Sequence, residues 1–201
     1  MIYLASRSPR RRELLAQMGV KFEHLLFRGG ARQDADTDEA VQPGENPDDY
    51  VRRVTLMKAA AAWERVVMRR GLQHKPVLAA DTTVALASEI LGKPEDRADA
   101  ERILALLSGT QHRVLTAVAI QLDSRVEMAV SESRVTFATL DEARIAAYVA
   151  SGEPFDKAGA YAIQGRAGAF VERLEGSYTG VMGLPLYETA QLLRLFGVMV
   201  P

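Results

Sequence analysis

The sequence predicts an α/β protein, because apolar runs of strand length alternate with amphipathic segments of helix length. An apolar run at 2–5 leads directly into a helix start, and the most strand-like stretch, 76–87, follows a long helical segment at 47–70. Two β-rich stretches, 113–122 and 125–138, then follow one another with only a short turn between them. This order of elements is typical of a sheet covered by helices.

The first helix is predicted to begin at Pro9, directly after the strand at 2–5. Ser8 is a good N-cap, and proline suits the first helical position because its missing N–H would have no partner there. Arg10, Arg11 and Arg12 then place three cations where the helix dipole favours acidic residues. A bound anion would reverse this cost, so the pattern favours a phosphate site over the alternative, a solvated basic helix start.

The next elements are predicted as a strand at 20–27, a polar loop beside the site at 28–46 and a helix at 47–70 with Asn46 as its cap. Lys58 lies only about 40° around this helix from Val54. It therefore stands at the rim of the apolar stripe, which we assign to Tyr50, Val54, Met57 and Ala61. Spacing alone leaves two interpretations open, a lysine that snorkels to water and one that reaches into a cleft.

Asp81 interrupts the apolar strand predicted at 76–87. A carboxylate in a run that looks buried on both faces is costly unless it is paired, hydrogen-bonded or bound to a metal. One interpretation is an acceptor for a neighbouring loop, and the other is a metal ligand or a general base. Lys93 follows in the turn-like Gly92-Lys93-Pro94, which favours the functional interpretation.

The remaining elements are predicted as a helix at 97–107, strands at 113–122 and 125–138, a helix at 141–152, a glycine-rich segment at 153–183 and a helix at 185–196. No repeat or linker divides them. We therefore expect a single domain over residues 1–201, as one body or two closely joined lobes, with its chemistry in a cleft formed by distant segments.

Composition narrows the class of protein. The chain has 25 basic and 26 acidic residues, so we expect no coating of DNA, RNA or an anionic membrane. The absence of cysteine excludes disulfides, thiol catalysis and cysteine-ligated metals, and the three histidines lack zinc-ligand spacing. We find no apolar signal core or membrane-span pattern, which agrees with a cytoplasmic enzyme but does not require one.

Several motifs occur in an order that resembles the Maf family of nucleoside triphosphate pyrophosphatases. The resemblance covers essentially the whole chain. It rests on Leu4 to Leu15, Ala80-Asp81-Thr82, Gly92-Lys93-Pro94, Leu107-Ser108-Gly109-Thr110, Asp156 to Gly165, Gly176-Ser177-Tyr178 and Val181 to Leu186.

The resemblance implies an elongated mixed sheet flanked by helices, with two lobes around a cleft, similar to inosine triphosphate pyrophosphatases. It implies metal-dependent hydrolysis of a nucleoside triphosphate to the monophosphate and pyrophosphate, and it suggests a homodimer. Asp81 matches the proton acceptor. Arg10, Thr82 and Gln164 match the positions that separate substrate classes, and here they resemble the dTTP/UTP type. The 7-methyl-GTP type instead has Ser-Pro-Trp-Arg-Arg, Asp-Gln and Ser-Glu-Gly at these places.

These roles agree with the chemistry of the residues. Asp81 and Glu39 offer oxygen ligands that suit Mg²⁺ or Mn²⁺, and Gln164 offers a pyrimidine edge both a donor and an acceptor. The groups expected on the phosphates are Ser8, Arg10, Arg11, Lys58, Lys93 and Lys157. The chain departs from the family pattern in extra residues at about 28–35, before Glu39, and in Met57, where related sequences often carry Glu.

Three functions compete. The first is a dTTP/UTP pyrophosphatase that also acts on modified pyrimidine triphosphates. The second has the same chemistry on 7-methyl-GTP or CTP. The third is a nucleotide-binding regulator of cell division with vestigial hydrolysis, against which the intact Asp81, Lys93 and Arg10–Arg11 set argues, because binding alone needs no base.

Overall fold

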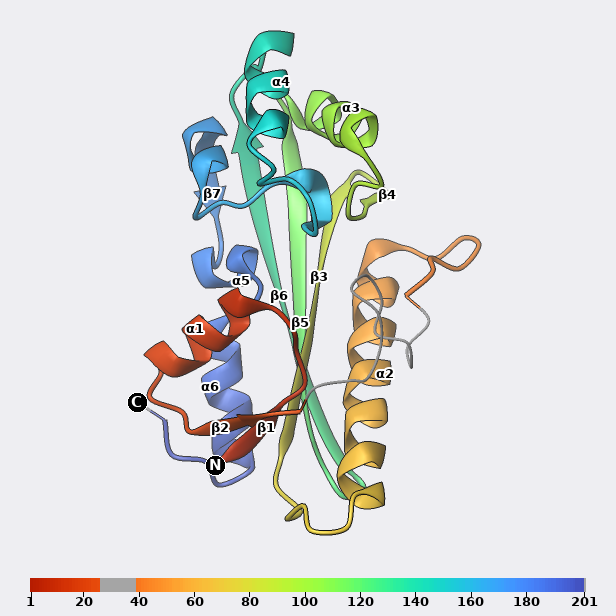
Figure 1. Ribbon diagram of the computed structural model, residues 1–201, viewed down its shortest axis with the longest axis vertical. Helices are drawn as coiled ribbons and strands as arrows, with labels where there is room; N and C mark the ends of the chain where they lie inside the picture. Colours follow the sequence, from red (N-terminus) through yellow and green to blue (C-terminus); the bar gives the residue numbers. More distant parts are fainter. Residues whose placement is uncertain (26–38, 201) are drawn as a thin grey trace.

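The computed structural model describes residues 1–25 and 39–200, which form a seven-stranded mixed sheet flanked by helices (Figure 1). The strand order is β2-β1-β3-β5-β6-β7, and β4 pairs with β3. β1 is parallel to β2 and β3, and the other pairs are antiparallel. The strands are β1 (Ile2–Leu4), β2 (Phe22–His24), β3 (Val77–Leu86), β4 (Glu89–Leu91), β5 (Gln111–Leu122), β6 (Arg125–Phe137) and β7 (Val171–Glu175).

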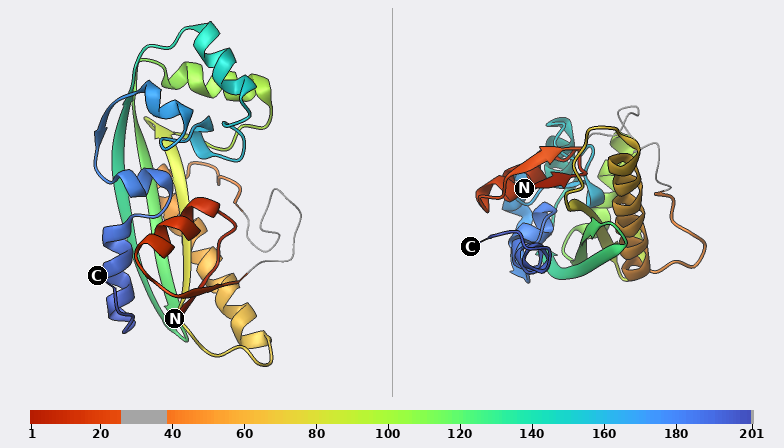
Figure 2. Two further views of the ribbon diagram at one scale, coloured as in Figure 1. Left: turned by 60° about the vertical axis from the view of Figure 1, so that its left-hand side comes forward. Right: turned by 90° about the horizontal axis from the view of Figure 1, so that it is seen from below.

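The helices divide between the two faces of the sheet (Figures 1 and 2). Helix α2 packs on one face, while α1, α5 and α6 pack on the other face at one end of the sheet and α3 and α4 at its other end. The helices are α1 (Pro9–Gln17), α2 (Pro47–Met68), α3 (Arg97–Leu107), α4 (Glu142–Ala150), α5 (Tyr178–Met182) and α6 (Leu186–Leu195), with 3₁₀ turns η1 (Ala158–Ala160) and η2 (Arg166–Phe170). The expected α/β class, with a mixed sheet and two lobes, is confirmed.

Strand β3 shows how period-two alternation builds this arrangement. Val77 and Ala79 pack with α2, whereas Leu78 and Ala80 pack with α1 and α6. Further along, Val84 joins the core of α3 and α4. The core of α1 and α6 and the core of α3 and α4 define two lobes at the two ends of the sheet. Residues 81 and 82 lie between these cores and therefore point to opposite faces at the level where the two lobes meet.

Several helix starts follow the sequence signals. The Ser8 side chain accepts from the backbone N–H of Arg11, and Asn46 caps α2 through the N–H of Asp49. Asp141 caps α4 in the same way. Each cap satisfies one of the backbone donors that a helix leaves without a partner at its N-terminus.

Three expectations about elements are corrected. The strand predicted at 20–27 is reduced, within the described residues, to β2, because its partner β1 offers only three residues for parallel pairing. The strand predicted at 76–87 turns back at Ala87, which has a φ of 53°, into the unpredicted β4. The glycine-rich segment contains β7 and α5, which its composition does not reveal.

The buried face of α2 also differs from the predicted stripe. Of the four residues assigned to it, only Val54 is buried, and the buried residues include Val51, Lys58, Ala59 and Ala62. Small side chains at 59 and 62 let the helix lie close to β3, which rotates the contact line away from Tyr50 and Met57. Lys58 thus lies within the buried face and not at its rim.

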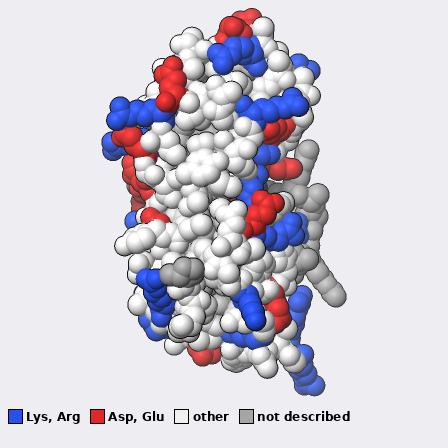
Figure 3. Space-filling view, turned by 90° about the vertical axis from the view of Figure 1, so that its left-hand side faces the viewer, with Lys and Arg blue, Asp and Glu red and all other residues white. Residues whose placement is uncertain are grey.

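The surface and the helices add two observations. On the face drawn in Figure 3, basic and acidic side chains of both signs surround a broad uncharged area. Among the residues that the structure describes, no helix combines the length and the apolarity needed to cross a membrane.

Candidate active site

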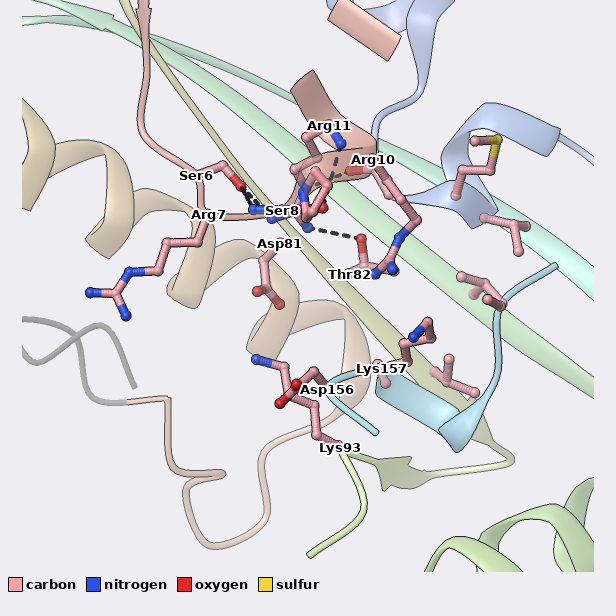
Figure 4. A pocket seen from close by; sticks show the side chains of 18 of the residues that line it. Ser6, Arg7, Ser8, Arg10, Arg11, Asp81, Thr82, Lys93, Asp156 and Lys157 are labelled. Atoms are coloured by element: carbon pink, nitrogen blue, oxygen red, sulfur yellow. Dashed lines mark hydrogen bonds between the residues drawn. The ribbon is translucent and has the colours of Figure 1, made fainter. Parts of the chain in front are cut away.

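A gap along one edge of β3 forms the site. β1 pairs with this edge at Val77 and Leu78, and β4 pairs with it from Val84 to Leu86. No described strand pairs with the edge between them. A cavity of about 470 Å³ opens there, between the two lobes, and reaches both Asp81 and Thr82 (Figure 4).

Every residue predicted for the site lines this cavity. The structure brings them together from α1, the segment before α2, α2, β3 and the loops around β4, η1 and η2: Ser8, Arg10, Arg11, Glu39, Lys58, Asp81, Thr82, Lys93, Lys157 and Gln164. Arg7, Asp156 and Tyr161 also line it, and the sequence analysis did not select them. All three stand inside the matched motifs, but their spacing carries no separate signal.

Lys58 lies between two carboxylates. Its Nζ is 2.8 Å from Asp81 Oδ1 and 2.8 Å from Glu39 Oε1, with Lys58 only 7% and Asp81 only 9% exposed. Burial lowers the pKa of Lys58, but Asp81 and Glu39 outweigh burial and raise it overall. Lys58 is therefore a permanent cation that holds two anions at one point. Its neighbouring charges come from these two residues and not from position 57.

Glu39 is held in place by α2. The Tyr50 hydroxyl donates to the Glu39 carbonyl at 3.0 Å, and Arg53 Nη2 donates to the Ala40 carbonyl at 2.9 Å. Arg53 also pairs with Glu45. This anchoring explains how Glu39 reaches the site after the extra residues near 28–35, which lie outside the described residues.

The start of α1 supplies arginines in two different situations. Arg11 is tied to the protein, because its Nε donates to the Gly183 carbonyl at 2.7 Å and its Nη2 to Thr82 Oγ1 at 3.1 Å (Figure 4). Arg10 is partly buried, and burial lowers its pKa. Burial, followed by the charge of Arg10, also lowers the pKa of Lys157. Two half-buried cations that repel each other favour an anionic ligand between them.

The turn that carries Gln164 is fixed from behind by Glu153. The Glu153 carboxylate accepts from the Tyr148 hydroxyl at 2.9 Å and from the backbone N–H of Arg166 at 3.1 Å. A Cβ at Gly165 would lie 2.3 Å from Glu153 Oε1, so any other residue at this position would displace the Glu153 carboxylate from these hydrogen bonds. Burial raises the pKa of Glu153, but these hydrogen bonds outweigh it, and the pKa is lowered. Sequence reasoning missed Glu153, because nothing in its spacing shows that it supports the turn.

Part of the cavity lining is apolar. It is formed by side chains of β3, β5, α5 and the segment around η1, namely Val84, Val114, Val181, Met182, Phe155 and Tyr161. The Tyr161 hydroxyl lies 2.9 Å from Nε2 of His112. Burial lowers the pKa of His112 to about 4, so this histidine is neutral at physiological pH. The cavity therefore combines two kinds of lining: the cations Arg10, Lys93 and Lys157, called the cationic wall below, and these apolar side chains, called the apolar slot.

The donor set fits a hard divalent cation only in part. Asp81 and Glu39 converge on one point, and both offer the carboxylate oxygens that Mg²⁺ and Mn²⁺ prefer. Within the described part of the chain, no group of three or more His, Cys, Asp or Glu residues is arranged to hold a metal. Two carboxylates suit an ion that takes its remaining ligands from water and substrate phosphates.

Comparisons with known proteins agree with the geometry. The family profile described as Maf-like protein matches residues 1–196. A dTTP/UTP pyrophosphatase of Aromatoleum aromaticum is 59% identical over 197 residues, covering 98% of this chain and 95% of that protein. One from Cupriavidus metallidurans is 58% identical over 198 residues, with 98% of each chain covered. The structure of the Staphylococcus aureus Ham1 protein is similar in fold, with a TM-score of 0.50, 15% identity and coverage of 97% and 96%.

Proposed function

This chain belongs to the Maf-like protein family, and on that premise we propose that it hydrolyses dTTP and UTP to the monophosphate and pyrophosphate. The relatives named dTTP/UTP pyrophosphatase align with nearly the whole chain. The observation that carries the proposal is the cavity itself, which a buried carboxylate, Asp81, lines together with the cationic wall and the apolar slot. A triphosphate with a flat base has this same division of charge and apolar surface.

In the proposed mechanism, Asp81 accepts a proton from the attacking water. The water oxygen forms a bond to the α-phosphorus, the bond from that phosphorus to the bridging oxygen breaks, and pyrophosphate leaves with the electron pair. Lys58 orients Asp81 through their 2.8 Å contact. Arg10, Lys93 and Lys157 on the cavity wall offset the charge of the triphosphate, and Ser8 and Arg11 hold the start of α1 in position.

We also propose that Mg²⁺ or Mn²⁺ is the cofactor, held by Asp81 and Glu39. When bound, the ion supplies charge neutralisation and a lower pKa for water in its coordination shell. Lys58 lies at the point where these two carboxylates converge, so ammonium and metal compete for the same oxygens.

This competition predicts the behaviour of Lys58→Met. Without nucleotide, Mn²⁺ should raise the melting temperature of this variant more than that of the wild type, because both carboxylates lose their resident cation. Thermal melting with and without Mn²⁺ measures the difference. Lys58→Met combined with Asp81→Asn is the control, in which the added shift should vanish. Equal shifts in Lys58→Met and wild type would count against the metal proposal.

The base is proposed to lie in the apolar slot, where Thr82 and Gln164 read its polar edge. Thr82 contacts Arg11, and Gln164 lies on the turn that Glu153 fixes. We further propose a cytoplasmic enzyme that acts on free nucleotides without DNA, RNA or a membrane, and that forms a homodimer.

One assay tests the function directly. Pyrophosphate release is measured across dTTP, UTP, CTP, 7-methyl-GTP and modified pyrimidine triphosphates, with Mg²⁺ or Mn²⁺ present. The expected result is highest kcat/KM for dTTP and UTP. A higher kcat/KM for CTP or 7-methyl-GTP would mean that the enzyme has the same activity with a different base specificity. Measurable binding without turnover on any nucleotide would favour a regulatory protein.

A further inference from the structure

A chain of hydrogen bonds runs along the face of the sheet on which α1 and α5 pack, beginning at the cavity. Arg11 Nη2 donates to Thr82 Oγ1 at 3.1 Å, and Thr82 Oγ1 lies 3.0 Å from Thr116 Oγ1 on the adjacent strand, with which it is in register. Thr116 Oγ1 in turn donates to the carbonyl oxygen of Gly180 at 2.8 Å. The chain joins α1, β3, β5 and α5.

The direction of each bond follows from counting protons. The Gly180 carbonyl can only accept, so it takes the one hydroxyl proton of Thr116. Thr116 is completely buried, which leaves no water to take its place. The Thr82–Thr116 contact therefore uses the Thr82 proton, with Thr82 as donor. A guanidinium only donates, so Thr82 Oγ1 accepts from Arg11, and this leaves the Thr82 proton for Thr116.

The consequence for the cavity is a fixed polarity at Thr82. Its proton points along the face of the sheet toward Thr116, and Arg11 takes one of its two lone pairs. Thr82 lines the cavity, so the group it has left for a ligand is a lone pair. A threonine whose hydroxyl is free to rotate would instead offer either a donor or an acceptor.

We infer that Thr116 is a positioning residue for substrate choice, which makes Thr82 an acceptor that selects an imide N–H on the base. Uracil and thymine carry such an N–H at ring position 3, whereas cytosine has an acceptor there. An acceptor facing an acceptor leaves two groups without a partner, which is the arrangement that discriminates strongly between similar ligands. The inference rests on the proposed function and names the atom that separates UTP and dTTP from CTP.

The test compares Thr116→Val, which keeps the shape and removes the hydroxyl, with Thr116→Ser, which keeps the hydroxyl. The measured quantity is the ratio of kcat/KM for UTP to that for CTP, with UTP methylated at N3 as a second substrate that lacks the N–H. In Thr116→Val the Thr82 hydroxyl is free to rotate, so both selectivity ratios should fall by roughly 10-fold, the value of one hydrogen bond. Thr116→Ser should keep the wild-type ratios.

A double-mutant cycle separates positioning from general damage to the fold. Because Thr116 acts through Thr82, Thr116→Val combined with Thr82→Val should be no less selective than Thr82→Val alone. Additive losses would mean that Thr116 supports the fold and does not orient Thr82, and they would overturn the inference. If Thr116→Val fails to fold, Thr82→Val against Thr82→Ser is compared instead, and equal selectivity in that pair overturns it as well.

Binding measurements keep this test separate from the proposed function. The affinities of nonhydrolysable UTP and CTP analogues are measured by calorimetry for the wild type and for Thr116→Val. Absence of turnover in the wild type would refute the pyrophosphatase proposal. A UTP-to-CTP affinity ratio that is unchanged by Thr116→Val would refute the inference, whether or not hydrolysis is observed.

Discussion

At the scale of single residues, the proposed reaction depends most on Asp81. Asp81→Asn should lower kcat roughly 10²–10⁴-fold, because the amide cannot accept a proton from water. Nucleotide binding, measured by calorimetry, should persist, since the cationic wall is intact. Asp156→Asn is the matched control, as Asp156 is an exposed carboxylate that also lines the cavity, and it should remain within a few-fold of wild type. Activity of Asp81→Asn close to that of the control would refute the assignment of Asp81 as the proton acceptor.

His112 gives a residue-scale prediction for stability. Burial lowers its pKa from 6.5 to about 4 in the folded protein. Below pH 6.5 the His112 imidazole therefore binds a proton in the unfolded state but not in the folded state. The free energy of unfolding therefore decreases as the pH falls from 6.5 toward 4. The expected loss from this group is about 2 kcal/mol between pH 7 and pH 5. Urea unfolding of wild type and His112→Gln at both pH values measures it, and identical losses would contradict the prediction.

At the scale of elements, the N-terminal turn of α1 provides matched arginines. Arg10 and Arg11 line the cavity, whereas Arg12 is exposed and is not part of its wall. Arg10→Ala should weaken binding of a nonhydrolysable nucleotide by roughly 10- to 100-fold, the value of a charge-assisted hydrogen bond, and the loss should shrink as salt rises. Arg11→Ala should weaken it as well, because the bonds from Arg11 to Gly183 and Thr82 hold the start of α1 in position. Arg12→Ala should have little effect on calorimetric affinity. Equal losses in all three variants would indicate a general electrostatic effect and no defined phosphate site.

At the scale of the whole molecule, the cavity joins two lobes that share one sheet. A ligand bound between them should stabilise both lobes together, because β3 and β5 run through each. At a concentration 100 times its Kd, a nonhydrolysable UTP analogue should raise the melting temperature by roughly 5–10 °C in a single transition. Calorimetric melting shows this directly, with Arg10→Ala at the same nucleotide concentration as the control. Two transitions, of which only one moves, would show that the lobes unfold independently.

The sequence by itself determined the local structure wherever short-range chemistry decides it. Ser8 and Asn46 cap helices as predicted, because a cap involves residues only three positions apart. The motifs also indicated the correct segments for the cavity, since all the predicted site residues line it. Whether these residues carry the assigned roles stays a prediction for the experiments above.

Only the tertiary structure decided which residues meet. Helical spacing left Lys58 with two equal interpretations, and the choice came from Asp81 and Glu39, which are 23 and 19 positions away in the chain. The support that Glu153 gives to the Gln164 turn and the link from Thr116 to Thr82 likewise join segments with no common sequence signal. The physical reason is range: caps and periodicity act within a few residues, whereas ion pairs and buried hydroxyl chains depend on how the sheet brings distant strands into register.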